Sequence, residues 1–151
     1  MGQLFRPSSS ICVKSNANIA LVKYWGKRDD NIFLPTRSSL SVTLKNLITT
    51  TTASISFSGQ DSFSLGTRQS SSVKMDPKAK RFFDIFRKNY NLNIHFDVIS
   101  KNSFPTTAGI ASSASGFSAM ATALSKLCGL NLNQRELSIL ARLGSGSACR
   151  S

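Results

Sequence analysis

The segment of residues 104–116 has the composition of a phosphate-binding loop. It reads Phe-Pro-Thr-Thr-Ala-Gly-Ile-Ala-Ser-Ser-Ala-Ser-Gly, between a predicted strand and a predicted helix. Small side chains let the backbone approach a ligand, and the unpartnered first amides of a helix attract anions. The Ser112 and Ser113 hydroxyls can add hydrogen-bond donors for an anion, or a hydroxyl ligand for Mg²⁺. A serine-capped helix after a flexible turn is the structural alternative.

An aromatic turn flanked by cations lies near the N-terminus. Residues 18–28 read Asn-Ile-Ala-Leu-Val-Lys-Tyr-Trp-Gly-Lys-Arg, a strand followed by a glycine-containing turn. Lys27 could neutralise a phosphate or orient a reacting oxygen, and the Tyr24 hydroxyl could donate a hydrogen bond to an anion. The alternative is a strand end with core aromatics and solvated cations.

A third segment of small polar residues ends in an arginine. Residues 144–151 read Gly-Ser-Gly-Ser-Ala-Cys-Arg-Ser and follow a predicted helix. Serine hydroxyls and backbone amides are anion donors, and the Arg150 guanidinium is a planar fork suited to a carboxylate or phosphate. A flexible tail with an inert thiol at Cys149 is the alternative.

Period-two patterns predict the strands that would position these segments. Residues 11–22 predict one or two short strands around a turn. Residues 39–44 alternate, with Leu40, Val42 and Leu44 on one face, which predicts a half-buried strand. Residues 48–57 are rich in β-branched side chains and predict a further strand. Residues 94–98 alternate in the same way.

Three helices are predicted from caps and from three- and four-residue spacing. The first begins at Asp76, a capping residue followed by proline. The second runs from about Ser112 to Cys128, and the third begins at Asn133 with Glu136 as a capping-box partner. The order of elements predicts one α+β domain over residues 1–151, with helices on one face of a mixed or mostly antiparallel sheet.

Composition excludes several classes of protein. The chain has 151 residues, 40% hydrophobic, and a net charge of +12, which favours polyanionic ligands. Three widely spaced cysteines and one histidine argue against a disulfide framework or a zinc site, and His95 is interpreted as an ordinary sheet residue. No apolar run has the roughly 20 residues of a membrane span, and residues 1–10 lack the features of a secretory signal. A cytoplasmic protein is expected.

Together these segments resemble a known family. Gly109-Ile110-Ala111-Ser112-Ser113 is similar to the second motif of the small-molecule kinases of the GHMP superfamily. The more restricted motifs, Tyr24-Trp25-Gly26-Lys27 and Ser145-Gly146-Ser147-Ala148-Cys149-Arg150, resemble the signatures of diphosphomevalonate decarboxylases. The resemblance implies the N-terminal, ribosomal-protein-like domain of the GHMP kinase fold, without the C-terminal domain.

The resemblance also implies an activity. The family uses ATP and Mg²⁺ to phosphorylate the 3-hydroxyl of mevalonate 5-diphosphate, and loss of phosphate and CO₂ then gives isopentenyl diphosphate. It implies substrate contacts from both restricted motifs, with Lys27 near the reacting hydroxyl and Arg150 on the carboxylate. It also implies that ATP phosphates are held by Gly109, Ile110, Ala111, Ser112 and Ser113, with Ser113 as a candidate Mg²⁺ ligand. A catalytic aspartate is expected beyond residue 151, so the chain alone should bind phosphates weakly without turnover. A homodimer of the full-length form is expected, with no nucleic acid or membrane partner.

Two alternatives remain. A phosphomevalonate decarboxylase or a mevalonate 3-kinase would share the fold and much of the site. A small basic RNA-binding domain would also suit the charge, but it should show clustered cations with exposed aromatic rings. Here the basic residues are dispersed and the phenylalanines fall on predicted core faces.

Overall fold

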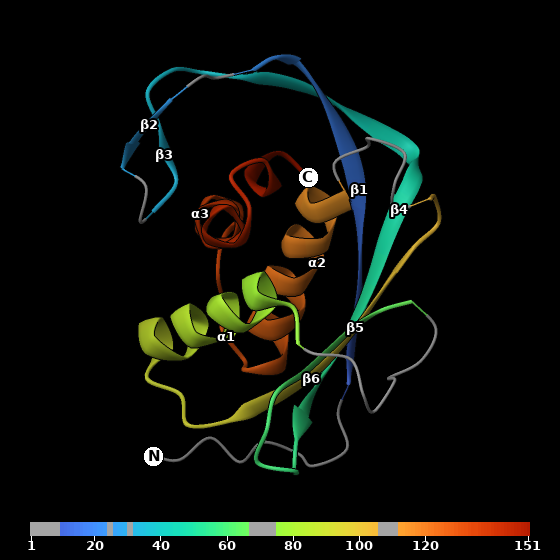
Figure 1. The fold of residues 1–151 in the computed structure, drawn as a ribbon, viewed down its shortest axis with the longest axis vertical. Helices are drawn as coiled ribbons and strands as arrows, with labels where there is room; N and C mark the ends of the chain where they lie inside the picture. The colour runs from blue at the N-terminus through green and yellow to red at the C-terminus, as the bar shows by residue number, and fades with distance from the viewer. Residues whose placement is uncertain (1–9, 24–25, 30–31, 67–74, 106–111) are drawn as a thin grey trace.

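A four-stranded mixed sheet, covered on one face by helices, forms the body of the molecule (Figure 1). The computed structural model describes residues 10–23, 26–29, 32–66, 75–105 and 112–151. The sheet has the order β1-β4-β6-β5. Its strands are β1 (Ile11–Val22), β4 (Leu40–Ser56), β5 (Ser62–Leu65) and β6 (His95–Asn102), and the helices are α1 (Pro77–Tyr90), α2 (Ser112–Leu127) and α3 (Gln134–Gly144). The predicted α+β class is confirmed.

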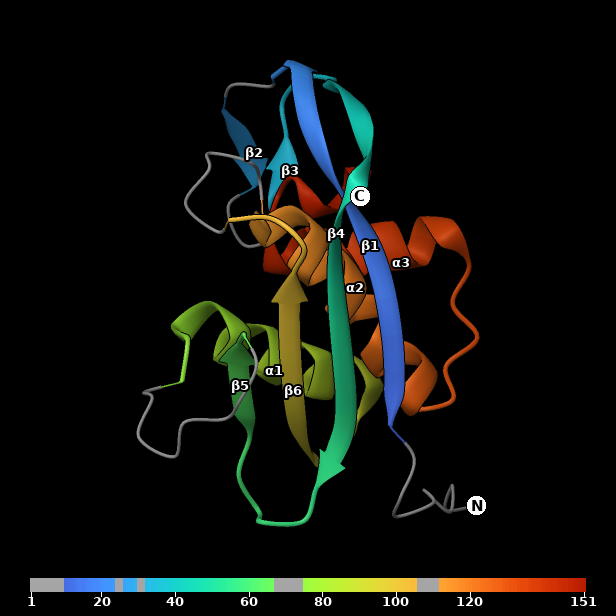
Figure 2. The ribbon, with the colours of Figure 1, turned by 90° about the vertical axis from the view of Figure 1, so that its right-hand side faces the viewer.

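The direction of the strands follows from their connections. β1 pairs with β4 and β4 pairs with β6, both antiparallel, whereas β5 runs parallel to β6. A parallel pair needs a crossover, and α1 lies in the connection between β5 and β6. Figure 2 looks onto the sheet with the helices behind it. The helices therefore cover a single face, as the sequence predicts.

Two strand predictions are wrong in their boundaries. Residues 11–22 form one continuous strand, with register shifts at Asn16/Asn18 and at Ala20/Val22 in place of a turn. The sequence predicts separate strands over residues 39–44 and 48–57, yet the structure has the single 17-residue β4. Residues 44–47 carry no glycine or proline, so the chain passes through a bulge opposite Asn16 and Asn18 instead of turning.

The predicted buried face of residues 39–44 is also wrong. Leu40 is 58% exposed and Val42 is 48% exposed. Leu21 and Val22 on the facing strand are 62% and 54% exposed. In Figure 1 these ends of β1 and β4 extend beyond α2, so none of the helices in the described part of the chain covers them. We call Leu21, Val22, Leu40 and Val42 the apolar tip.

The helix caps are confirmed. The Asp76 carboxylate accepts from the backbone amides of Lys78 and Ala79, with Pro77 at the first helical position. Asn133 and Glu136 form both hydrogen bonds of a capping box. Gly129, at a φ of 66°, follows α2 in the left-handed conformation expected after a helix. Within the described ranges, no helix is long and apolar enough to cross a membrane.

The core lies between the helices and the sheet and is rich in aromatic rings. Phe82, Phe83 and Phe86 of α1 are fully buried, as the spacing predicts. Phe83 and Phe86 contact Phe96 of β6 at centroid distances of 5.5 and 5.8 Å. From α2, Met120 and Leu124 complete this core. His95 opens β6 as a sheet residue, with Nδ1 3.5 Å from an Asp61 carboxylate oxygen.

A small antiparallel hairpin lies apart from the main sheet. It pairs β2 (Lys27–Asp29) with β3 (Leu34–Pro35). The Gly26 carbonyl accepts from the Thr36 amide and hydroxyl at 3.5 and 3.4 Å, which ties the start of the hairpin to its end. Figure 1 shows β1 and β4 arching over the helices toward this hairpin, so the hairpin lies to the side of α3.

Candidate functional site

The loop after α3 is held against two helices. The Ser138 hydroxyl donates to the Cys149 carbonyl at 3.0 Å, and the Ser118 hydroxyl donates to the Ser151 carbonyl at 2.9 Å. Ala148 is buried, and residues Ala148–Arg150 form one turn of 3₁₀ helix, η1. The Cys149 thiol donates to the Gly146 carbonyl within the loop. This segment is therefore packed structure and not the flexible tail of the alternative interpretation.

Gly144 determines how closely this loop approaches α2. A Cβ atom at Gly144 would lie 2.1 Å from the Phe117 ring, which no real side chain tolerates. The absence of a side chain therefore allows the end of α3 to rest on that ring. Ser145 and Ser147 follow directly, with their hydroxyl oxygens 3.4 Å apart.

Arg150 has one donor satisfied and one buried donor without a partner. Its Nη1 donates to the Ser39 hydroxyl at 2.8 Å. Its Nε is buried and has no hydrogen-bond partner. A buried N–H group without a partner is costly, so a ligand oxygen here would relieve that cost. Beside it, the buried Asn18 amide donates to the Ser151 hydroxyl at 2.5 Å.

Lys27 lies over an aromatic ring. Its Nζ is 4.6 Å from the centroid of the Phe33 ring, and the Arg81 guanidinium lies 5.2 Å from the same centroid. Such cation–π contacts stabilise a charge without neutralising it. The ammonium is thereby placed at the wall of a cavity.

That cavity brings the aromatic-turn segment and the loop after α3 together. It has a volume of about 550 Å³. Its lining is Asn18, Ile19, Ala20, Lys23, Lys27, Phe33, Ser145, Gly146, Ser147 and Arg150. Three cations and no carboxylate of the described residues face it, so the cavity favours an anionic ligand. We call it the cationic cavity.

Two smaller cavities connect the helix start to this site. One, of about 180 Å³, is lined by Phe33, Lys78, Arg81, Ser113, Phe117, Leu143, Gly144, Ser145 and Gly146. It shares Phe33, Ser145 and Gly146 with the cationic cavity, so we call it the junction cavity. The other, of about 190 Å³, lies between β6, the start of α1 and the start of α2 and includes Ser112 and Ser113. Phe63, Leu65 and Met120 give this third cavity its apolar part.

A buried hydroxyl network fixes the start of α2. The Thr49 and Ser115 hydroxyls are 2.6 Å apart, and Thr49 also donates to the Asn102 side-chain oxygen at 2.7 Å. Thr49 and Ser115 are fully buried. The Asn102 Nδ2 is buried without a partner beside the third cavity. These bonds hold the first turn of α2 against the sheet.

The predicted site residues fall into four groups. Lys27, Ser145, Gly146, Ser147 and Arg150 line the cationic cavity, and Ser112 and Ser113 line the cavities next to it. Ala148 and Cys149 belong to the same loop, where they support it and are not among the lining residues. Gly26 opens the hairpin at a φ of 86°. Tyr24, Trp25, Gly109, Ile110 and Ala111 lie outside the described residues.

The sequence interpretation missed Asn18, Phe33, Ser39, Lys78 and Arg81. One signal was available for one of them. The first turn of α1 has no acidic residue after its Asp76 cap, and Lys78 lies in that turn, where the helix dipole disfavours cations. Cations at an unfavourable helix end indicate an anion-binding role. Asn18, Phe33, Ser39 and Arg81 carried no comparable signal.

The fold and these cavities identify the class of protein to which the chain is similar. A mixed sheet with helices on one face, and a serine-lined helix start beside a cationic cavity, is the N-terminal part of a GHMP-kinase-type fold. Within that class, the chain belongs to the family of the diphosphomevalonate decarboxylase-like N-terminal domain, which it matches over residues 15–151.

Named relatives support the same assignment. The diphosphomevalonate decarboxylases of Candida albicans and Homo sapiens are 39% and 38% identical to the chain, and the alignments cover 94% and 97% of it. They cover 42% and 40% of those relatives, so the chain spans about two fifths of their length.

Solved structures of mevalonate diphosphate decarboxylases have the same fold as the chain over the part that is aligned. Mevalonate diphosphate decarboxylase from Enterococcus faecalis superposes with a TM-score of 0.84 at 44% identity, over 94% of this chain and 44% of that one. The Staphylococcus aureus enzyme gives 0.86 at 38% identity, over 94% and 43%. A further solved structure, of MDDEF in complex with MVAPP, AMPPCP and magnesium, has a TM-score of 0.83 at 42% identity, over 94% of this chain and 43% of that one.

Proposed function

We propose that this chain supplies the substrate cavity and part of the ATP site of an ATP-dependent diphosphomevalonate decarboxylase. The observation that carries the proposal is the cationic cavity, which unites Lys27, Arg150 and the two serines from opposite ends of the sequence. The substrate would be mevalonate 5-diphosphate, an anion at both ends. The product would be isopentenyl diphosphate, with ADP, phosphate and CO₂.

Each wall of the cavity suits one part of that substrate. The Arg150 guanidinium, with its unpartnered Nε, would bind the carboxylate and align it for loss as CO₂. The Ser145 and Ser147 hydroxyls would hold the carboxylate and diphosphate ends. Lys27 would lie near the 3-hydroxyl and stabilise negative charge as that oxygen attacks phosphorus. Phosphoryl transfer depends chiefly on such positioning and charge stabilisation.

The nucleotide would approach from the start of α2. Ser112 and Ser113 would bind its phosphates, with Lys78 on the facing helix as a counter-charge. The apolar third cavity beside them has room for part of the nucleoside.

Mg²⁺ binds oxygen and is commonly held by one or two protein ligands together with substrate phosphates. The oxygen donors at the start of α2 fit that pattern, and Ser113 is the proposed protein ligand. When bound, the ion would neutralise charge on the phosphates.

The proton of the 3-hydroxyl needs an acceptor. Within the described part of the chain, no carboxylate lines the cationic cavity. We propose that the base comes from the further length that the relatives possess. The 151-residue chain alone is accordingly expected to bind substrate without turning it over.

Calorimetry on this chain tests substrate binding directly. Mevalonate 5-diphosphate should bind, and Arg150→Ala and Lys27→Met should each weaken binding at least about tenfold, since each removes a charged contact. Lys126→Ala, at the far end of α2, is the matched control. Tighter binding of mevalonate or its 5-phosphate would instead favour a mevalonate 3-kinase or a phosphomevalonate decarboxylase.

A chimera tests the reaction. Residues 1–151 joined to the remaining part of the Candida albicans enzyme should release CO₂ and ADP from mevalonate 5-diphosphate and ATP. Arg150→Ala should lower kcat by about a hundredfold or more, because the carboxylate loses its fork-like partner. Near-normal kcat in a folded Arg150→Ala chimera would exclude the proposed role.

A further inference from the structure

Two buried threonine hydroxyls of β4 differ in what they join. Thr49 and Thr51 are two positions apart on this strand, so they share a face, and both are fully buried. The Thr51 hydroxyl lies 2.7 Å from that of Ser100, its direct partner on β6. The Thr49 hydroxyl bonds its own β6 partner, Asn102, and also lies 2.6 Å from the Ser115 hydroxyl of α2. The first pair joins strands that the backbone already joins, whereas the second extends to a helix.

The direction of each hydrogen bond in this network follows from counting protons. A hydroxyl has one proton to donate. The Thr49 proton goes to the Asn102 side-chain oxygen, so Ser115 is the donor in its contact with Thr49. The other acceptor near Ser115 is the Ser112 carbonyl of its own helix, at 3.3 Å. Without the Thr49 hydroxyl, the Ser115 proton would be donated to that carbonyl, and the first turn of α2 would lose this bond to the sheet.

A hydrogen bond locates a helix more narrowly than apolar packing does. Hydrogen bonds between hydroxyl oxygens keep to about 2.5–3.0 Å and need alignment, whereas carbon atoms attract one another over a broader range of distances. Further along, the buried face of α2 is mainly apolar and includes Phe117, Met120 and Leu124. Its second buried serine, Ser125, donates to the Ala121 carbonyl of the same helix. The bond at the first turn therefore fixes the depth and the rotation of this end of α2.

The same end of α2 carries the side chains proposed to hold the nucleotide phosphates. Ser112 and Ser113 open the helix and line the third cavity together with Thr49 and Asn102. Donors hold a ligand well only when they are placed to within about 0.5 Å. A bond that sets the depth of this turn therefore also sets the position of the two serine hydroxyls.

We propose that Thr49 is a positioning residue for the nucleotide, acting through Ser115 on the phosphate-binding start of α2. The positioning role rests on the proposed function in one respect, which is that nucleotide phosphates bind at this helix start. It requires neither mevalonate 5-diphosphate nor the cationic cavity. Because Thr49 itself lines the third cavity, it could also contact the nucleoside directly. Ser115 lines none of the three cavities, so its variants separate positioning from direct contact.

The first test removes each side of the hydroxyl contact. Calorimetry measures the affinity of the 151-residue chain for ATP with Mg²⁺. Thr49→Val and Ser115→Ala should each weaken binding about tenfold, whereas Thr49→Ser, which keeps the hydroxyl, should bind within about twofold of the unsubstituted chain. Thr51→Val and Ser125→Ala are matched controls, because each removes a buried hydroxyl with a 2.7 Å bond away from the start of α2. Each control should change the affinity less than about twofold.

A double variant and a second ligand test the mechanism. Thr49→Val combined with Ser115→Ala should bind ATP no more weakly than either single variant, since both remove the same contact. Mevalonate 5-diphosphate affinity should stay unchanged, because neither hydroxyl lines the cationic cavity.

Four outcomes would overturn the positioning role. They are equal ATP affinities of Thr49→Val and Thr51→Val, a loss in Thr49→Val without one in Ser115→Ala, an equal loss of mevalonate 5-diphosphate affinity, and no ATP binding by the unsubstituted chain. In the last case, mevalonate 5-diphosphate binding would still test the substrate cavity separately.

Hydrogen exchange monitors the helix start without a ligand. The backbone amides of residues 116–118 close the first turns of α2. They should exchange faster in Thr49→Val and Ser115→Ala than in Thr51→Val and Ser125→Ala, because the first turn is then held less firmly against the sheet. Equal exchange in all four variants would show that the hydroxyl contact does not hold this end of the helix, and the positioning role would be lost.

Discussion

The anion-binding role predicted for Arg150 follows from its residue type, whereas its orientation depends on a residue distant in the sequence. Its type and motif made it predictable as an anion-binding fork, as did the types of Lys27, Ser145 and Ser147. Its orientation was not predictable, because Nη1 is held by Ser39, which lies 111 positions earlier in the chain. Sequence spacing shows which side chains lie near each other within an element. It does not show which hydroxyl a distant strand end will present.

Removing the Ser39 hydroxyl should weaken substrate binding without unfolding the chain. In Ser39→Ala the Arg150 guanidinium loses its 2.8 Å contact and gains freedom. Calorimetry with mevalonate 5-diphosphate should show affinity about five- to tenfold lower, while the free energy of unfolding changes by less than about 1 kcal/mol.

Ser38→Ala is the control for that change, since Ser38 is the exposed neighbour in the chain. If Ser38→Ala and Ser39→Ala bind the ligand equally well, the Ser39 contact does not orient the guanidinium.

At the scale of elements, the helices were better predicted than the strands. Asp76 and Asn133 carry the cap information in their own side chains, so their helices begin where the sequence indicates. Alternation in residues 39–44 correctly predicts a strand, but it predicts neither its continuation through residues 44–47 nor the absence of a helix over Leu40 and Val42. Whether a strand face is buried depends on how far the helices extend over the sheet, which the sequence of the strand does not show.

The packing of α3 against α2 should depend on Gly144, which has no side chain. Gly144→Ala places a methyl group against the Phe117 ring, so either the ring or the loop of Ser145–Arg150 must shift. We expect a loss of about 1 to 3 kcal/mol in the free energy of unfolding, measured with urea, together with weaker ligand binding.

Gly116→Ala provides the comparison, because a Cβ at Gly116 in α2 meets nothing within 4 Å. This change should leave stability unchanged or raise it by up to about 1 kcal/mol, since alanine favours a helix over glycine. A Gly144→Ala variant as stable as the Gly116→Ala variant would contradict the close-approach argument.

Burial of Cys128 just after α2 should make stability depend on alkaline pH. Burial raises the pKa of this thiol from 9.0 to about 11, because the thiolate is poorly solvated in the core. The folded state thus prefers the protonated thiol, and the resulting stability is present below pH 9.0 and lost as the pH rises toward about 11. Since a tenfold change in an acid dissociation constant corresponds to about 1.4 kcal/mol, the stability lost is about 2 to 3 kcal/mol.

Urea unfolding at pH 8 to 11 measures this effect, and Cys128→Ala should show a shallower decline than the unsubstituted chain. Burial also raises the pKa of Tyr90, so a smaller alkaline decline should remain in the variant. Parallel curves for the two proteins would show that the thiol does not contribute.

For the whole molecule, stability should come from the helix-covered part of the sheet and not from the apolar tip. Leu21→Ser and Leu40→Ser remove side chains that are 62% and 58% exposed, so each should cost less than about 1 kcal/mol. Leu124→Ala removes a fully buried side chain and should cost about 2 to 5 kcal/mol. Urea titration of the three variants checks this ordering, and a large loss at Leu40 would show that the tip is covered in solution.

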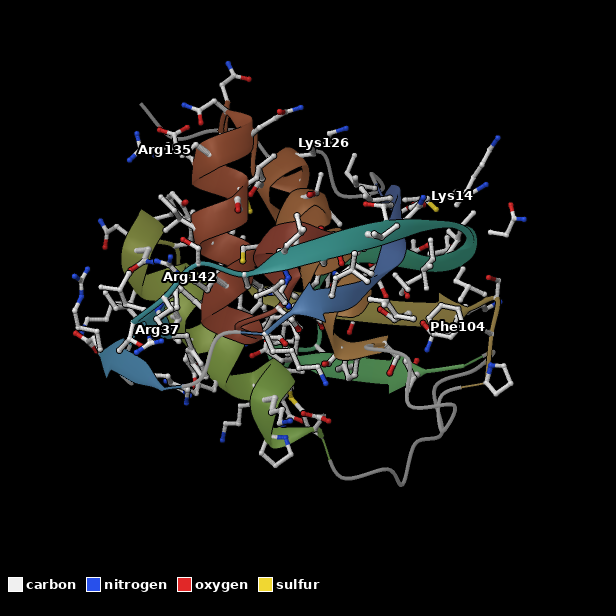
Figure 3. The ribbon with its side chains drawn as sticks, turned by 90° about the horizontal axis from the view of Figure 1, so that it is seen from above. Lys14, Arg37, Phe104, Lys126, Arg135 and Arg142 are labelled. Carbon is white, nitrogen blue, oxygen red and sulfur yellow. The ribbon has the colours of Figure 1, made fainter. Side chains whose placement is uncertain are left out.

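The distribution of charged residues is also a property of the whole molecule. In Figure 3, Lys14, Lys126 and Arg135 lie apart from one another, whereas Arg37 and Arg142 lie on the same side of the view. Among the described residues, Lys23, Lys27 and Arg150 face the cationic cavity together, and Lys78 and Arg81 face the junction cavity. The net charge of +12 indicated an anionic partner, but only the arrangement of strands and loop shows where several of these charges converge.

The hydrogen bond between Asn18 and Ser151 has a consequence for the order of folding. It joins side chains 133 positions apart, and Ile11 of the same strand pairs with Ala53 of β4. Contacts at such separation form late, because much chain entropy is lost before they contribute. The ability to bind a ligand should therefore emerge only in the final phase of refolding, after contacts between residues that are closer in the sequence have formed.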